Sequence, residues 1–275
     1  MTMITSAENK KEGLIVKEAV GKQKKATLEI TQKIASSEWN RAQFILKIAL
    51  PAIFSSLVYK IRDTFNIIAL GHLDEKELMA GVGMGNACIH LMGLSIILGL
   101  NSALDTLVSN AAGAGDLELC GVYLNRARVI LTVCFLPIIL IQRQLEGILL
   151  AAGQDAKVSA YTAEFIFYSL PGLYLLALQN AQLKFLNNLG KTKVPMYCNM
   201  VTVVMHPIWL YYLTDKDQLN LRMVGVGIAN VISYALVLSL NLIYSSMLDD
   251  IKDSIFWPDA RSFYGLWTQV LIGSQ

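Results

Sequence analysis

Apolar runs long enough to cross a bilayer recur along this chain, and they restrict it to a helical membrane fold. A transmembrane helix needs about 20 mostly apolar residues. Lipid offers no hydrogen-bond partners, so each spanning run is predicted to be a helix that satisfies its own backbone. The runs of this length cover residues 44–70, 78–100, 123–142, 161–185, 194–213 and 223–247. They predict an all-α, polytopic transmembrane bundle with six spans and the start of a seventh.

Composition agrees with a membrane protein and excludes several other classes. Of 275 residues, 54% are hydrophobic and 16% are charged, whereas a soluble domain carries about 25% charged residues. The net charge of +2 is too small to suggest a nucleic-acid partner. The four cysteines are scattered without a CxxC spacing. We therefore expect buried apolar cysteines rather than disulfides or metal ligands.

The same pattern divides the chain into three regions. Residues 1–41 are polar and predict a flexible cytosolic tail, with a lipid-surface helix as the alternative. Residues 42–247 hold the six-helix membrane lobe, and 248–275 are expected to form a cytosolic loop and the start of a truncated seventh helix. No cleavable signal peptide is expected, because no apolar segment follows a basic start.

Lys and Arg residues set the expected orientation. With the basic tail inside, the inner loops and the tail together hold more of them than the outer loops do. The positive-inside rule then places the N-terminus in the cytosol of a multi-pass integral membrane protein. A plasma membrane and a vacuolar-type membrane are both compatible with this pattern.

The first span carries an unusual polar stripe. Its polar residues fall at three- and four-residue steps and so share one helix face; they are Ser56, Tyr59, Lys60, Asp63 and Asn66. Such a stripe is expected to face the bundle or a wet cavity rather than lipid. Two interpretations stay open: Lys60 and Asp63 neutralise each other, or the stripe lines a cavity for a substrate or cation. Arg62 lies off the stripe and is expected to snorkel outward.

Later spans add three further polar candidates. Gln179 and Gln182 lie at i and i+3, where they could line the same cavity or bond a neighbouring helix. His206 could be a hydrogen-bonded interior residue or a proton relay, and the first interpretation is favoured.

The stretch from Gly71 to Arg128 has the most distinctive pattern. Its second span is rich in glycines expected to permit close helix approach, namely Gly81, Gly83, Gly85, Gly93 and Gly99. A polar break over 101–106 is predicted to end this helix, with Asp105 capping it or pairing with Arg126 or Arg128. A loop of small residues over 111–115 follows, and basic residues over 125–128 lie near the start of the next span.

This stretch resembles the multidrug and toxic compound extrusion (MATE) family, and is most similar to its eukaryotic branch. The segments that carry the resemblance are Gly71-His72-Leu73, 99–107 (GLNSALDTL), Gly113-Ala114-Gly115 and 123–127 (YLNRA). The motif residues within them are Gly71, Gly99, Asp105, Thr106, Gly113, Gly115 and Arg126.

The resemblance implies a fold of two six-helix lobes, of which this chain matches the first. It implies export of organic cations or other xenobiotics in exchange for protons or sodium ions, with no cofactor beyond the coupling ion. The implied partners are the lipid bilayer, small organic substrates and a second lobe or another copy. The family's coupling Glu in a seventh helix would lie beyond Gln275. The bacterial coupling Asp falls on Asn66, one turn after Asp63.

No pattern of catalytic residues accompanies these features. A Walker loop, a GxSxG elbow and an HExxH pair are all missing from the sequence, so we expect neither an enzyme nor ATP-driven transport. A secondary transporter, either a fragment or a half that assembles with another half, is the main hypothesis. A seven-span receptor and a non-transporting gene fragment are the alternatives; the receptor is disfavoured by the absence of an Asp-Arg-Tyr and an Asn-Pro-x-x-Tyr motif.

Overall fold

The computed structural model describes residues 38–71, 75–215 and 217–273. Most of the predicted tail, His72 and Leu73 of the family motif, and Gln275 therefore lie outside the described residues. The chain divides into two units, residues 1–51 and 52–275. Of the first unit only 38–51 are described, and they form the beginning of α2 (Glu38–Gly71). All further contacts below lie within the second unit.

All regular secondary structure in the described part of the chain is helical, and this part contains no strand. After α2 come α3 (Lys76–Ile89), a π-helical turn η1 (His90–Leu94), α4 (Ser95–Gly113), α5 (Leu117–Arg143), α6 (Leu145–Ala151), α7 (Ala156–Asn188), α8 (Lys193–Thr214) and α9 (Arg222–Ser246). Two 3₁₀ turns, η2 (Lys252–Ser254) and η3 (Ala260–Phe263), lead to α10 (Leu266–Gly273). The all-α prediction is confirmed.

Every predicted span falls on a long helix, although the number of spans stays a prediction. Among the described residues, four segments are long and apolar enough to cross a membrane: Lys76–Gly113, Leu117–Arg143, Ala156–Asn188 and Arg222–Ser246. The other two expected spans lie in α2 and α8, of 34 and 22 residues, which are not among these four.

The polar break over 101–106 does not end a helix, so that expectation was wrong. The helix continues to Gly113 because the polar side chains find backbone partners. Asn101 is fully buried and donates to the Ala177 carbonyl of α7 at 3.3 Å. Ser109 donates to the Asp105 carbonyl one turn earlier in the same helix.

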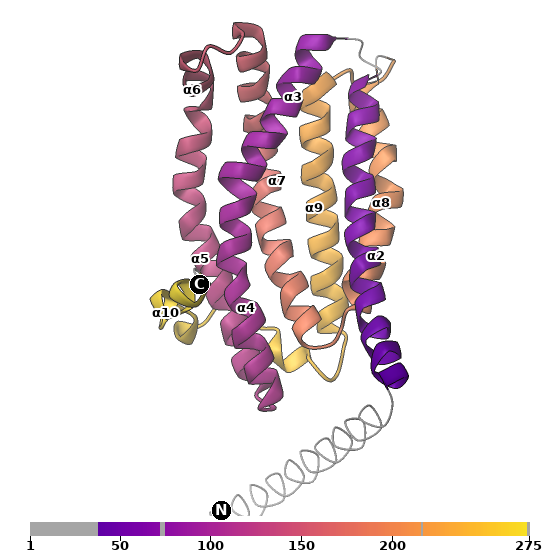
Figure 1. Cartoon of the computed structure of the whole chain (residues 1–275), viewed down its shortest axis with the longest axis vertical. Helices are drawn as coiled ribbons and strands as arrows, with labels where there is room; N and C mark the ends of the chain where they lie inside the picture. The colour runs from indigo at the N-terminus through magenta and orange to yellow at the C-terminus, as the bar shows by residue number, and fades with distance from the viewer. Residues whose placement is uncertain (1–37, 72–74, 216, 274–275) are drawn as a thin grey trace, which may run out of the picture. The chain divides into compact units, whose positions relative to one another are not determined.

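Helix α7 is the centre of the second unit, since it packs against α3, α4, α5, α6 and α9 (Figure 1). Part of the predicted glycine stripe explains the close approach of α3 to α7. A Cβ on Gly81 would lie 2.6 Å from the Cβ of Tyr161, and one on Gly85 would meet the Phe165 ring. Gly93 approaches Leu173 in the same way. Gly83 and Gly99 have open space instead, because they lie on other faces of the helix.

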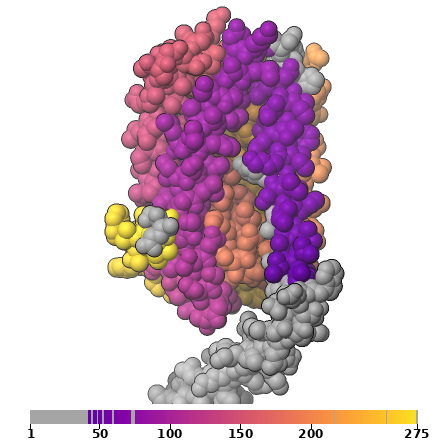
Figure 2. All heavy atoms as spheres, viewed as in Figure 1, coloured from indigo at the N-terminus to yellow at the C-terminus, as the bar shows by residue number. Residues whose placement is uncertain are grey.

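The C-terminal segment, residues 248–273, lies on the surface of α4 and α5. Figure 2 shows its last part, in yellow, at the edge of the molecule, and α10 contacts α4 and α5. Asn125 of α5 donates to the Phe256 carbonyl at 2.9 Å, and Gln269 donates to the Tyr123 carbonyl at 3.2 Å. These bonds fix the segment along the first half of α5.

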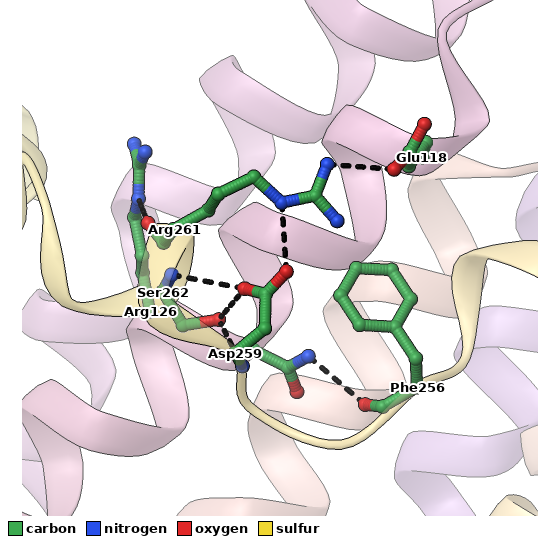
Figure 3. Close-up of polar contacts among 7 residues, drawn as sticks. Glu118, Arg126, Phe256, Asp259, Arg261 and Ser262 are labelled. Atoms are coloured by element: carbon green, nitrogen blue, oxygen red, sulfur yellow. Dashed lines mark hydrogen bonds and ion pairs between the residues drawn. The ribbon is translucent and has the colours of Figure 1, made fainter.

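An ionic cluster completes this attachment (Figure 3). Arg261 donates to Glu118 of α5 at 2.6 Å and to Asp259 at 2.7 Å. Asp259 also caps η3, where it accepts from the Ser262 N–H at 3.2 Å. Arg126 donates to the Arg261 carbonyl at 3.2 Å. The hydrogen bonds from Arg261 and then from Ser262 hold the pKa of Asp259 below its usual range.

Candidate substrate and ion cavity

A polar cavity of about 230 Å³ lies between α2, α3, η1, α7 and α9. Asp63 and Asn66 of α2 contribute to its wall, with Asn86, His90 and Asn230 from the other helices. The rest of the lining is mainly apolar and aromatic. A concave site with a few converging polar groups in apolar walls is the usual form of a small-molecule site.

The cavity receives only part of the polar stripe predicted on the first span. Asp63 is half-buried and Asn66 is buried, whereas Ser56 is exposed. The side chain of Tyr59 lies outside the described part. Lys60 approaches Asp63 at 4.0 Å, but its own side chain is 70% exposed. An exposed ion pair of this kind interacts weakly, so the Asp63 carboxyl group stays available to the cavity.

Behind the cavity wall lies a chain of neutral hydrogen bonds. Asn66 Nδ2 donates to Asn230 Oδ1 at 3.0 Å, which leaves Asn66 Oδ1 to bond His206 Nε2 at 2.9 Å. His206 Nδ1 bonds the Ser233 hydroxyl at 2.7 Å. An amide oxygen can only accept, so His206 Nε2 carries the proton and Nδ1 accepts from Ser233. His206 is fully buried, in agreement with the interior interpretation.

Arg62 does not snorkel, so the prediction for this residue was wrong. Its side chain is only 4% exposed, and its guanidinium lies 4.2 Å from the centre of the Tyr234 ring. The reason is helical register: Arg62 precedes Asn66 by four residues, and such residues share a face. The face that brings Asn66 to Asn230 of α9 therefore brings Arg62 to Tyr234 of α9.

Gln179 and Gln182 are buried in α7 but do not line this cavity. Gln182 accepts from Arg128 of α5 at 2.9 Å and donates to Ser245 of α9 at 3.3 Å. Of the two roles that the sequence left open, Gln182 has the second, because its position on α7 points toward α5 and α9.

Most motif residues lie on α4, at the α4–α5 turn or on α5, and Asp105 contacts the C-terminal part of α7. Asp105 pairs with Lys184 and accepts from Asn188 at 3.2 Å, both on α7. The predicted pairing with Arg126 or Arg128 was wrong, because these arginines bond the C-terminal segment and Gln182. Gly115 has a φ of +79°, as the turn after α4 requires. Gly71 ends α2, while Gly99 and Thr106 lie within α4 and Gly113 is its last residue.

Sequence reasoning missed several cavity residues. Asn86 and His90 lie four residues apart on one helical face, and Asn230 is a polar residue within an apolar span. Ser169 of α7 also lines the cavity, and its buried hydroxyl has no hydrogen-bond partner among the described residues. Polar residues at helical spacing in apolar runs were the available signal.

The cavity suits a cation or a polar organic molecule. Among the described residues, its lining holds one carboxylate, Asp63, beside amides, a histidine and a hydroxyl. Within the described ranges, no group of three or more His, Cys, Asp or Glu side chains could hold a metal ion. The four cysteines lie apart as free thiols.

The helical membrane bundle around this cavity is that of one lobe of a MATE-type transporter fold. The MatE family profile matches residues 51–213, and the chain belongs to this family. Multidrug and toxin extrusion protein 1 of Oryctolagus cuniculus is 31% identical over 210 residues, which cover 74% of this chain and 36% of that protein. Protein DETOXIFICATION 29 of Arabidopsis thaliana is 30% identical over 225 residues, which cover 81% of this chain and 44% of that protein.

Solved structures agree with this assignment. The crystal structure of the eukaryotic MATE transporter AtDTX14 superposes with a TM-score of 0.75 at 23% identity. The match covers 90% of this chain and 52% of that one. The chain thus spans about half the length of the transporters it matches, or less.

Proposed function

We propose that this chain forms one lobe of a secondary multidrug and toxin exporter, and that the cavity at Asp63 and Asn66 contacts a cationic substrate or the coupling ion. The observation that carries the proposal is the half-buried Asp63 carboxylate, which opens onto a cavity where the described lining residues include no second acid. An entering organic cation, proton or sodium ion supplies the complementary charge. Family membership favours a transporter over both an enzyme and the receptor alternative.

Coupled export requires more than this lobe. Alternating access in such transporters comes from two repeats that move against each other around a central site. The relatives are two to three times as long as the part that this chain matches. We therefore expect residues 1–275 alone to bind an organic cation but not to drive its efflux, unless a second lobe or another copy completes the transporter.

Cation binding to the purified chain tests the cavity. A fluorescent organic cation should bind, and Asp63→Asn should weaken binding about tenfold, the effect of losing one charge-assisted contact. Glu146→Gln is the matched control, since Glu146 is an exposed acid on α6 away from the cavity. Equal affinity of Asp63→Asn and the unchanged chain would contradict the proposed site.

Proteoliposomes test the claim about coupling. With an imposed pH or sodium gradient, vesicles that contain only this chain should show no gradient-driven movement of the fluorescent cation. Gradient-dependent movement that Asp63→Asn abolishes would overturn this expectation and make Asp63 the coupling residue.

We also propose that the N-terminus is cytosolic, on the strength of the distribution of Lys and Arg. A tag inserted in the loop over 214–220 should then be reachable from outside intact cells, and a tag before Arg41 should not. Both tags reachable from the same side would contradict the six-span topology.

A further inference from the structure

A second cavity, of about 800 Å³, lies away from the first, between α5, α7, α9 and the C-terminal segment. Its walls are mostly apolar. Among the described residues that line it, Arg128 is the only charged one, and none is a carboxylate. This cavity is therefore amphipathic and positively charged, and it is separate from the proposed transport site.

Arg128 lacks an anionic partner within the described part of the chain. Its guanidinium donates to two neutral amide oxygens, Asn125 Oδ1 and Gln182 Oε1, both at 2.9 Å. It forms no ion pair with any described carboxylate. A half-buried charge with only neutral partners is costly unless an anion approaches it. No guanidinium nitrogen of Arg128 is both buried and without a hydrogen-bond partner within the described residues. Any of its nitrogens that has no protein partner is therefore accessible to a ligand.

Aromatic residues place Arg128 near the level of lipid headgroups. Trp257 and Phe263 line the cavity and are 90% and 58% exposed, and Tyr264 and Trp267 beside them are also exposed. Trp and Tyr gather at membrane–water interfaces. The segment that carries them is bonded to Tyr123, Asn125 and Arg126 of α5. Arg128 follows Arg126 by two residues, about 3 Å along the helix axis.

The cavity becomes less polar along α5 beyond Arg128. One turn further on, the Thr132 hydroxyl bonds the Tyr174 hydroxyl at 2.9 Å. Leu178 of α7 lies between Gln182, which bonds Arg128, and Tyr174, so apolar side chains separate the cation from this hydroxyl pair. A cation with aliphatic walls beside it suits the phosphate and an acyl chain of a phospholipid.

We propose that this groove binds one anionic phospholipid, with its phosphate on Arg128 and an acyl chain along Leu178, Leu238 and Val133. The bound phosphate supplies the missing counter-charge, and the aromatic rim of the C-terminal segment covers the headgroup side. The lipid joins α5, α9 and the C-terminal segment on the face of α7 away from the Asp63 cavity.

Lipid retention by the full chain tests the proposal. The chain is purified in detergent with phosphatidylglycerol or phosphatidylcholine added at equal concentration, and bound lipid is counted by native mass spectrometry. Phosphatidylglycerol should be retained about tenfold over phosphatidylcholine. Both lipids carry the phosphate, but phosphatidylcholine also brings a choline cation, which Arg128 repels and for which the described lining holds no carboxylate. Arg128→Gln should remove the preference, and Arg128→Lys should keep part of it.

Two matched variants keep the test decisive. Arg143→Gln removes an exposed charge at the other end of α5, away from the cavity lining and the C-terminal segment, and it should leave lipid retention unchanged. Val133→Trp fills the apolar part of the groove at a 60% exposed position and should reduce retention with Arg128 intact, even if Arg128→Gln fails to fold. Equal retention of both lipids, or displacement of phosphatidylglycerol by millimolar inorganic phosphate, would overturn the proposal.

Discussion

Two polar clusters in the second unit join segments that are distant in the sequence. One cluster consists of neutral side chains, and the other consists of charged side chains. The cluster behind the Asp63 cavity links α2, α8 and α9 through Asn66, His206 and Asn230, all neutral. The cluster on the C-terminal segment links it to α5 through Glu118, Arg261 and Asp259, all charged. The first is buried, and the second is largely exposed.

The difference follows from the surroundings of each cluster. In a bundle interior an unpaired polar group costs more than its hydrogen bond contributes, because no water replaces the lost partner. At the surface, water solvates each charge whether or not the pair forms, so an exposed pair stabilises little. Substitutions in the buried cluster should therefore disturb the whole bundle, and those in the exposed cluster only the C-terminal segment.

The largest effect is expected from His206→Ala. The change leaves Asn66 Oδ1 without its partner, deprives the Ser233 hydroxyl of its acceptor and opens a void in the core. We expect the free energy of unfolding in detergent to fall by about 3 kcal/mol. Met205→Ala, the neighbouring position at 39% exposure, is the control and should cost much less. Equal losses in the two variants would show that the hydrogen-bond chain does not stabilise the bundle.

The sequence predicted the helices well and the side-chain partners less well. Apolar runs identify long helices because lipid allows little else, and the resemblance placed the fold within one lobe. Asp63 and Asn66 were found because polar residues at helical spacing stand out in an apolar run. Periodicity alone cannot give the rotation of one helix relative to another, however. For this reason Arg62, Gln182 and Asp105 were assigned to the wrong neighbours or left open.

The C-terminal segment shows the same limit. Its sequence predicted a loop and the start of a helix. Nothing in its spacing indicated that Asn125 and Glu118 of α5 bond to this segment, or that Gln269 of the segment bonds to α5. These contacts join residues more than 130 positions apart. Whether α10 begins a further span stays a prediction.

A smaller effect is expected from Gly121→Ala, which should disturb the attachment of the C-terminal segment and leave the buried cluster intact. A Cβ at this position would collide with the Ser254 carbonyl and the Phe256 ring. Overpacking of this kind costs about 1–3 kcal/mol, and detachment of the C-terminal segment relieves it. Proteolysis between 256 and 267 should accelerate while the unfolding temperature of the bundle stays constant. Gly147→Ala, a helical glycine with open space around it, is the matched control.

A still smaller effect is expected from Glu118→Gln. The side chains of Arg261 and Glu118 are 55% and 64% exposed. An exposed pair stabilises only weakly and is screened by salt. Protease protection of the segment should fall slightly in dilute buffer, and the difference from the unchanged chain should vanish at high salt. A large, salt-independent loss would mean that Glu118 acts through packing rather than charge.

The smallest effect is a pH dependence confined to the same segment. Arg261 and Ser262 hold the pKa of Asp259 below its usual range, so the folded segment favours the ionised carboxylate. A group whose pKa is lowered on folding contributes above its unfolded pKa, which is about 3.9 for Asp, and loses that contribution as the pH falls through the folded value. Attachment of the segment should therefore be constant near neutral pH and weaken only in strong acid. Pepsin, which is active there and prefers aromatic sites such as Phe263 and Tyr264, measures this loosening. Cleavage of the unchanged chain should be slower than that of Asp259→Asn at pH 4, and the two rates should converge as the pH approaches 2. A constant ratio across this range would show that the Asp259 carboxylate does not hold the segment in place.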